Sequence, residues 1–330
     1  MEAYLPTIFA GMMGLSLLIY VILDGYDLGI GMLLPFGNED EQDMMIAAIG
    51  PFWDANETWI VFGVGILLVA FPQAHGLVLS TLYLPVSAML IGLVLRGIAF
   101  DFRAKAVAEH KERWNRIFTC GSLLATCAQG WMLGSYITGL RQDATGLLFS
   151  GLITLCLPSL YLMLGAAWLL VKSEGSLFDK AMRWARLALL PMGATLLLVS
   201  LATPLVSSTI AAKWFSWPGL LQLSPIPLIS IAAYATMLWM LFFREQPLHR
   251  RHWLLYGWLI VICVLAALGL AYSILPDIVI GRMTVTEAAA SPASLWFTFW
   301  GAIIVLPTVL VYTIVVYRIF SGKASPLSYD

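Results

Sequence analysis

Charged residues are scarce in this 330-residue chain. Asp, Glu, Lys and Arg together make up 11% of it and hydrophobic residues 60%, with a mean hydropathy of +0.87. A soluble globular chain averages about 25% charged and about 45–50% apolar residues. The scarcity of charge therefore excludes an ordinary soluble domain and predicts a polytopic, all-α membrane protein. The net charge of −1 gives no electrostatic reason to expect nucleic acid as a partner.

Ligands for a redox centre are also few. All the histidines fall in expected loops or at the ends of apolar runs, so no two imidazoles face each other at membrane depth: His75, His110, His249 and His252. Haem ligation by two axial His or Met side chains is therefore poorly supported, and the 14 methionines are expected to pack in the core. With no phosphate-binding glycine motif and no metal-ligand cluster, the chain alone does not look like a redox enzyme.

Cysteine pairs and a cleavable leader are missing as well. The four cysteines lie inside apolar runs without a CxxC spacing: Cys120, Cys127, Cys156 and Cys263. They are expected to be small packing residues, and they do not reveal the redox compartment. The first apolar run has no basic residues before it and no small-residue cleavage site, so we expect a retained helix.

What the chain does contain is a series of long apolar runs. A membrane-spanning helix needs roughly 20 mostly apolar residues, and nine runs qualify: 5–27, 53–72, 77–100, 117–140, 147–171, 184–206, 223–243, 253–275 and 294–319. The connections between them are short, which leaves no room for a separate soluble domain. Prolines inside several runs, such as Pro85, predict local kinks.

Basic residues fall mostly on one side of this arrangement. Fourteen Lys and Arg occupy the loops after the third, fifth and seventh spans and the C-terminal tail, whereas Arg141, Lys213 and Arg282 lie on the other side. By the positive-inside rule the C-terminus faces the cytoplasm and the N-terminus the periplasm. The loop 37–52 should be cytoplasmic, yet it carries four acids and no base: Glu39, Asp40, Glu41 and Asp43. Acidic residues contribute little to the rule, so the orientation stands.

Two carboxylates, Asp24 and Asp27, lie inside an otherwise uncharged stretch from Leu5 to Phe36. Charges at membrane depth are costly and suggest a functional site with a partner. Their spacing of three places them on one helix face if the first span continues through them. The alternative is a helix that ends at the interface, with two hydrated acids and a glycine turn.

A second polar cluster opens the second span. Trp53, Asp54, Asn56, Glu57 and Trp59 follow one another within seven residues. Asp54 and Glu57 resemble a capping box, which would make them structural, and tryptophan is common as an interfacial anchor. Capping does not account for Asn56 and two tryptophans, so cap and functional site both stay open.

Arg96 near the end of the third span is the natural partner for these acids. A guanidinium and a carboxylate at depth relieve each other's desolvation, and we expect Asp27 to pair with Arg96 more than Asp24 does. Arg96 could also be a snorkelling arginine in the last turn of the span. Asp101 and Arg103 follow it closely. The expected topology brings all three clusters to the same, cytoplasmic, membrane face.

Three segments together resemble subunit II of the cytochrome bd family of quinol oxidases, and most of all its cyanide-insensitive branch with short loops. They are DGYDLGIG at 24–31, WDANETW at 53–59 and RGIAFDFR at 96–103. The resemblance at motif level covers roughly residues 15–105, and from 117 onward it rests on the number and length of spans. Ala55 stands where the family usually has glycine, a change that affects how closely the second span packs.

The resemblance implies a fold of two four-helix bundles and one peripheral helix. We expect residues 1–140 to form the first bundle with the polar cluster, 141–276 the second bundle, and 277–330 the ninth helix and a cytoplasmic tail. It implies a heterodimer with a subunit I that carries haems b and d, in a bacterial cytoplasmic membrane. It also allows for small single-helix accessory subunits and for a bound quinone or lipid, which no residue here identifies.

The resulting hypothesis is a haem-free subunit of a terminal quinol oxidase, which stabilises subunit I and conducts cytoplasmic protons to its oxygen-reducing site. The proton pathway would use Asp54, Glu57, Asp24 and Asp27. Structural or interface roles would fall to Trp53, Asn56, Trp59, Arg96, Asp101 and Arg103. A proton- or cation-coupled transporter is the main alternative, although the buried acids lie in the first third of the chain without counterparts in the second half. A purely structural scaffold is the third.

Overall fold

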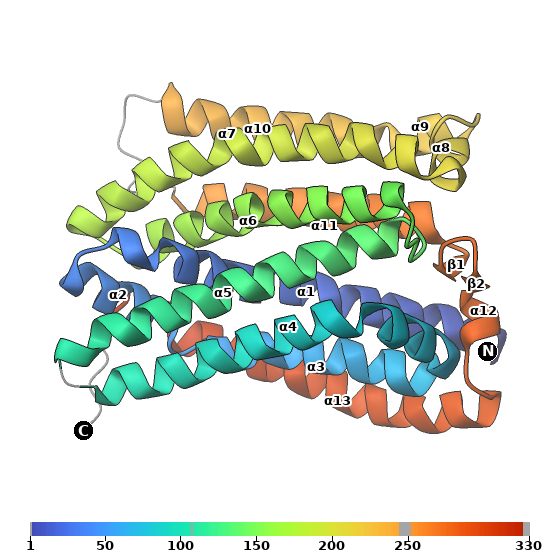
Figure 1. Ribbon diagram of the computed structural model, residues 1–330, viewed down its shortest axis with the longest axis horizontal. Helices are drawn as coiled ribbons and strands as arrows, with labels where there is room; N and C mark the ends of the chain where they lie inside the picture. The colour runs from blue at the N-terminus through green and yellow to red at the C-terminus, as the bar shows by residue number, and fades with distance from the viewer. Residues whose placement is uncertain (1, 107, 244–251, 326–330) are drawn as a thin grey trace.

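The apolar runs form long α-helices that lie side by side (Figure 1). The computed structural model describes residues 2–106, 108–243 and 252–325. Inside a bilayer no water is available to the backbone, so a spanning segment satisfies its N–H and C=O groups within its own helix. Within the described residues, eight helices are long and apolar enough to cross a membrane.

The long helices carry most of the chain. Their bounds are α1 Leu5–Leu33, α3 Trp53–Ala70, α4 Pro72–Lys105, α5 Ala108–Ile137, α6 Ala144–Lys172, α7 Gly175–Val206, α10 Pro225–Phe242, α11 Trp253–Ile274 and α13 Pro292–Ile319. Short elements connect them: η1 Glu2–Tyr4, η2 Leu34–Phe36, α2 Glu39–Ile49, α8 Ser208–Trp214, α9 Gly219–Leu223, β1 Asp277–Val279, β2 Met283–Thr284 and α12 Val285–Ala288. Strands β1 and β2 form an antiparallel hairpin.

Eight of the nine expected spans fall on the helices that qualify by length and composition. The expected span 117–140 falls on α5, a 30-residue helix that is not among them. Charged residues occupy the first turns of α5, and Ser122, Thr126 and Gln129 lie farther along it, which lowers its apolar content. The ninth span, and the grouping into two bundles and a peripheral helix, remain predictions.

Packing in the middle of the molecule is closest between α1 and α6. A Cβ on Gly165 would lie 2.6 Å from the carbonyl carbon of Gly29, and a Cβ on Gly29 would overlap the carbonyl oxygen of Tyr161. Small residues let helix backbones approach closely in membranes, where packing replaces the hydrophobic effect as the main attraction. The two glycines therefore fix how α1, which carries Asp24 and Asp27, lies against α6.

Helix α4 bends near the expected proline. Leu82 departs from helical geometry with φ −107° and ψ 19°, three residues before Pro85. Proline removes an intrahelical hydrogen bond and its ring clashes with the preceding turn. The predicted kink is confirmed here, and the part of α4 that carries Arg96 is a separate straight segment.

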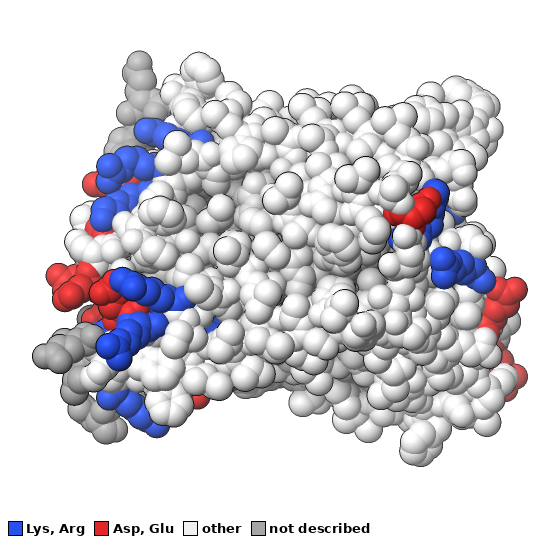
Figure 2. Space-filling view, viewed as in Figure 1, with Lys and Arg blue, Asp and Glu red and all other residues white. Residues whose placement is uncertain are grey.

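Charged side chains gather at the two ends of the helices. Figure 2 shows an uncharged middle band and most Lys and Arg at the end where α2 and the C-terminus lie. The second end, with the β1–β2 hairpin and α12, carries fewer charges in this view. This distribution follows the expected separation of basic and less charged loops. The basic residues Arg244, Arg250 and Arg251 and the histidine His249 lie outside the described residues.

We expect Gly29→Ala to destabilise the fold, because the added methyl group must push α1 away from α6. Overpacking typically costs about 1–3 kcal/mol. Thermal unfolding of the purified protein in detergent, followed by circular dichroism, measures the effect. Gly11→Ala on the same helix is the control, since its Cβ would meet nothing within 4 Å. Equal melting temperatures for the two variants would contradict the close contact.

Candidate functional site

The centre of the polar cluster is Arg96, which is fully buried on α4 with 1% of its surface exposed. Its Nη1 lies 2.6 Å from Oδ1 of Asp24 on α1, and its Nη2 donates to Oε1 of Glu57 on α3. One guanidinium thus joins three helices. Asp24 is fully buried, whereas the Glu57 side chain is 27% exposed.

The Asp24–Arg96 contact is an ion pair by distance without hydrogen-bond geometry. Both carboxylate oxygens of Asp24, and Nε and Nη1 of Arg96, have no hydrogen-bond partner among the described residues. A buried charge without full hydrogen bonding depends strongly on its counter-charge, because removal of either partner leaves the other desolvated. The pair is therefore a point where a small change in charge has a large energetic effect.

Asn56 on α3 is the second centre. Its Nδ2 donates to Oδ2 of Asp27 at 2.8 Å and to the hydroxyl of Tyr26 at 2.9 Å. Its Oδ1 accepts from the hydroxyl of Tyr317 on α13 at 2.9 Å, and the two tyrosine hydroxyls lie 2.6 Å apart. The side-chain amide of Asn56 has both a hydrogen-bond donor and an acceptor. It uses both where α1, α3 and α13 meet, which accounts for an asparagine at this position of the motif.

These contacts correct the expected pairing. Arg96 forms its ion pair with Asp24, whereas Asp27 is held by Asn56, so the preference for an Asp27–Arg96 pair was wrong. The alternative of two hydrated acids at a helix end is also wrong, since α1 continues to Leu33 and both carboxylates are fully buried. Because α1 continues through both acids, the condition is met under which their spacing of three places them on one helix face.

The capping alternative fails for the second cluster. Helix α3 begins at Trp53 after Phe52, and no side chain caps it. Asp54 lies inside the first turn and is exposed, while Glu57 is bound to Arg96. A capping box does exist nearby, formed by Asn38 and Glu41 at the start of α2.

The two tryptophans of this motif are packed inside the chain. Trp59 is 1% exposed and its Nε1 donates to Thr313 on α13 at 3.2 Å. Trp53 packs against Phe100 on α4, with ring centroids 5.3 Å apart. They connect α3 to α13 and to α4.

A separate ionic cluster holds α2 against the helix ends. Arg103 is buried and donates to Asp43 at 2.6 Å and to Asn115, and Lys111 donates to the same carboxylate at 3.0 Å. Lys180 on α7 pairs with Glu41 at 2.5 Å. Two of the four unexpected acids of the loop 37–52, Glu41 and Asp43, thus find bases on other helices. Asp101, next to this cluster in sequence, is exposed.

Both of these acids lie outside the membrane-spanning segments, and their surroundings favour the ionised form. Burial alone would raise the pKa of Glu41, but hydrogen bonds from Lys180 and from the Asn38 backbone outweigh it, so the pKa lies below its ordinary value. For Asp43, hydrogen bonds from Lys111 and Arg103 likewise outweigh burial and lower the pKa.

Several residues of the site gave no signal in the sequence. Tyr317 lies 261 positions after Asn56. Deeper in the core, Gln129 donates to Tyr20 at 2.8 Å and accepts from Tyr161 at 2.7 Å. Only Tyr26 could have been suspected, because it stands between the two acids in the first motif.

Lys172 was also missed, and it fixes the end of α13. It is 3% exposed and donates to the carbonyls of Phe320 and Gly322. Its ammonium group also lies over the rings of Phe52 and Trp168, 4.7 and 5.3 Å from their centroids. Backbone carbonyls and aromatic faces together replace water around this buried cation.

The described histidines lie near helix ends. His75, His110 and His252 lie at or just outside the ends of α4, α5 and α11, so no two of them flank a site at the depth of the core. All four cysteines are free, and two of them, Cys156 and Cys263, are buried as packing residues.

The fold and site define the class: an all-α membrane protein with an arginine–carboxylate cluster buried near the basic end of its helices. The family model for cytochrome bd terminal oxidase subunit II matches residues 5–320. The chain therefore belongs to the cytochrome bd terminal oxidase subunit II family, as the motifs predicted. It is thus a subunit of an oxidoreductase.

Individual relatives support the assignment. Cytochrome bd-I ubiquinol oxidase subunit 2 of Escherichia coli (strain K12) is 25% identical over 348 residues, which cover 92% of this chain and 90% of its own. Cytochrome bd ubiquinol oxidase subunit 2 of Bacillus subtilis (strain 168) is 37% identical over 130 residues, 38% of each chain. A chain in the structure of bd oxidase from Geobacillus thermodenitrificans shares the fold, with a TM-score of 0.74, 17% identity and coverage of 97% of this chain and 99% of that one.

We expect Arg96→Gln to destabilise the protein by about 3–5 kcal/mol, because it leaves Asp24 buried without a counter-charge. Unfolding in detergent with increasing denaturant measures this change. The double variant Arg96→Gln/Asp24→Asn should recover part of the loss, since the stranded charge is gone. Arg116→Gln, which removes an exposed pair with Glu112, is the control and should cost less than about 1 kcal/mol. A similar cost for both arginines would show that the Arg96 pair is not energetically special.

We expect the anchoring of α2 to weaken in acid. Because the folded pKa of Glu41 is lowered, the unfolded chain takes up the proton first, so the stability from this carboxylate is present above its ordinary pKa of 4.5 and is lost as pH falls through the folded value. The melting temperature of Glu41→Gln should therefore lie below wild type at pH 7, and the gap should begin to narrow at pH 4. Glu39→Gln, at an exposed position of the same helix, should track wild type at both pH values. A constant gap for Glu41→Gln would refute the linkage.

Proposed function

We propose that this chain is the haem-free subunit of a quinol:oxygen oxidoreductase, which stabilises a haem-bearing subunit I and guides protons from the cytoplasmic side toward the oxygen-reducing site of that partner. Membership of the family supports the oxidase assignment. The names of the relatives, which are ubiquinol oxidase subunits, support a quinol as the substrate of the complex. The transporter alternative loses its basis, because family membership accounts for the buried acids. The oxygen chemistry would be supplied by the haems of subunit I.

The observation that carries the proton role is a graded burial of carboxylates from one end of the molecule inward. Asp54 is exposed at the start of α3, Glu57 is 27% exposed one turn later, and Asp24 is fully buried. Residues three apart share a helix face, so Asp54 and Glu57 lie along one line into the protein. Such a series offers protons a stepwise entry from water.

Arg96 would set the charge of this route and not carry protons itself. A guanidinium stays protonated in proteins, so it cannot release a proton to the next group. Its contacts with both Glu57 and Asp24 hold the two carboxylates next to one fixed positive charge. Protonation of one acid would then alter the hold of Arg96 on the other.

Asp27 would act differently from Asp24. Asn56 holds its carboxylate and also binds Tyr26 and Tyr317. These contacts fix α13 beside α1 and α3, which favours a shaping role in addition to proton transfer. Asp101 and Asp54, exposed on α4 and α3, would be available to water or to the partner subunit.

The orientation of the route follows from the charges. The cluster residues lie toward the ends of α1 and α4 and the start of α3, and most Lys and Arg gather at this end of the helices (Figures 1 and 2). By the positive-inside rule this end faces the cytoplasm, and α5 would complete nine spans in a bacterial cytoplasmic membrane. Protons for oxygen reduction would then be drawn from the inner side, so turnover would build a membrane potential.

We expect Asp54→Asn to slow oxygen consumption by the intact complex about tenfold or more, in line with the loss of a positioned proton-transfer group. Haem absorbance should stay at the wild-type level, because Asp54 is at the surface. Asp179→Asn, at an exposed position of α7 outside the cluster, is the matched control and should consume oxygen at the wild-type rate. Unchanged turnover in Asp54→Asn would reduce this residue to a surface carboxylate.

The oxidase assignment itself is tested by mild purification. Haem bands should appear in the absorption spectrum together with a second, larger subunit, and should disappear when that subunit is removed. A colourless, partner-free protein that carries a substrate into vesicles would overturn the proposal.

A further inference from the structure

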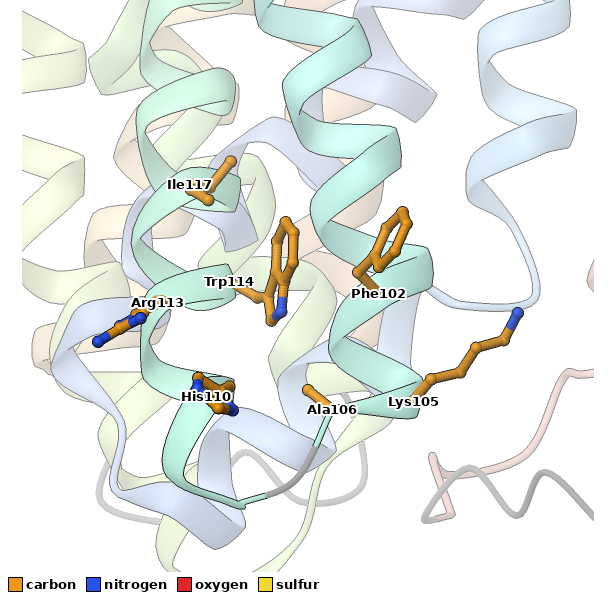
Figure 3. A pocket seen from close by; sticks show the side chains of 7 residues that line it. All are labelled: Phe102, Lys105, Ala106, His110, Arg113, Trp114 and Ile117. Atoms are coloured by element: carbon orange, nitrogen blue, oxygen red, sulfur yellow. The ribbon is translucent and has the colours of Figure 1, made fainter.

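A hollow of about 410 Å³ opens between the last turn of α4 and the first turns of α5 (Figure 3). Its walls include two aromatic rings, three basic side chains and an aliphatic one: Phe102, Trp114, Lys105, His110, Arg113 and Ile117. None of these residues belongs to the arginine–carboxylate cluster. The hollow is therefore a feature that the proposed proton route does not use.

The aromatic part forms an apolar wall. The rings of Phe102 and Trp114 stack with centroids 5.1 Å apart and an interplanar angle of 21°, one from each helix (Figure 3). Phe102 nevertheless remains 56% exposed. Tryptophan collects where the hydrocarbon core meets the headgroups, because it has an apolar body and a polar N–H. The stack thus marks the depth at which lipid headgroups begin.

The basic part borders the same hollow on the side away from the apolar band. In Figure 3 His110 lies below the aromatic stack, while Lys105 and Arg113 extend on opposite flanks. Neither Lys105 nor Arg113 forms an ion pair with a described residue, and both are exposed.

The other basic residues near the hollow are engaged in ion pairs. Arg103 and Lys111 are paired with Asp43, and Arg116 is paired with Glu112. The acid nearest to the hollow on α4 is Asp101, one turn before Lys105, and it forms no ion pair within the described part of the chain. The two cations at the hollow therefore keep their charge available to a ligand.

We propose that this hollow binds the phosphodiester headgroup of an anionic phospholipid, with an acyl chain lying along Phe102, Trp114 and Ile117. Basic pockets between transmembrane helices on the cytoplasmic side are suited to acidic headgroups. Lys105 and Arg113, which line the hollow on opposite flanks and are exposed, would supply the positive charge for the phosphate. A neutral phospholipid would leave both cations without a net counter-charge. The site is independent of the proposed oxidase function.

Lipid binding by the intact, delipidated complex in detergent tests this site. Phosphatidylglycerol and phosphatidylcholine with the same acyl chains are titrated separately, and bound lipid is counted by native mass spectrometry. The wild type should retain phosphatidylglycerol preferentially. The variant Lys105→Gln/Arg113→Gln should bind it about tenfold more weakly, because two favourable charges at the surface are lost. Arg116→Gln on the same helix, outside the hollow, should bind as wild type does.

A second measurement locates the lipid. Phosphatidylglycerol with brominated acyl chains quenches tryptophan fluorescence at contact distance, so Trp114→Phe should lose part of the quenching seen in wild type. This loss should vanish with brominated phosphatidylcholine at the same concentration. This quenching measurement uses only wild type and Trp114→Phe, so it does not depend on whether the charge variants fold.

Three results would overturn the proposal. Equal retention of phosphatidylglycerol by wild type and the double variant would show that Lys105 and Arg113 do not contribute to lipid binding. Equal binding of both lipids would show that charge is not recognised. Displacement of the lipid by inorganic phosphate at matching concentration would assign the hollow to a free anion instead of a lipid.

Discussion

The structure depends on one buried guanidinium. Arg96 lies between Asp24 and Glu57 on two other helices, in surroundings where an isolated charge would be costly. Removal of Arg96 would leave Asp24 buried without a counter-charge, and the contact of Arg96 with Glu57 adds α3, so α1, α3 and α4 are held in one mutual arrangement. The same arrangement would make the cluster responsive to protons, because a proton added to either acid changes how strongly Arg96 interacts with the other acid.

Two further constraints keep this ion pair in place. Gly29 and Gly165 let α1 lie directly against α6, which fixes the depth and rotation of Asp24. Asn56 then connects α1 to α13 through Asp27, Tyr26 and Tyr317. Helix α13 thereby contributes to the site, and Lys172 secures its end by binding the carbonyls of Phe320 and Gly322.

The ionic clusters at the basic end differ in what surrounds them. Asp24 and Arg96 are sealed from solvent, so their interaction is strong and sensitive to substitution. Asp43 is 42% exposed and shares its charge between Arg103 and Lys111, so water and salt screen it. This outer layer anchors α2 over the helix ends, whereas Lys105 and Arg113 at the hollow form no ion pair with a residue that the structure describes.

The sequence by itself determined the membrane class, eight of the helices and the unusual acids, because apolar runs and buried charges are local properties of composition. Its three motifs also identified the family. Only the tertiary structure decided which partner each polar group takes. Asp24 and Asp27 share a helix face. Which of them pairs with Arg96 depends on how α1 is rotated relative to α4, and spacing along the sequence does not specify that rotation. Tyr317 and Lys180 meet residues more than a hundred positions away, and no local pattern encodes such contacts.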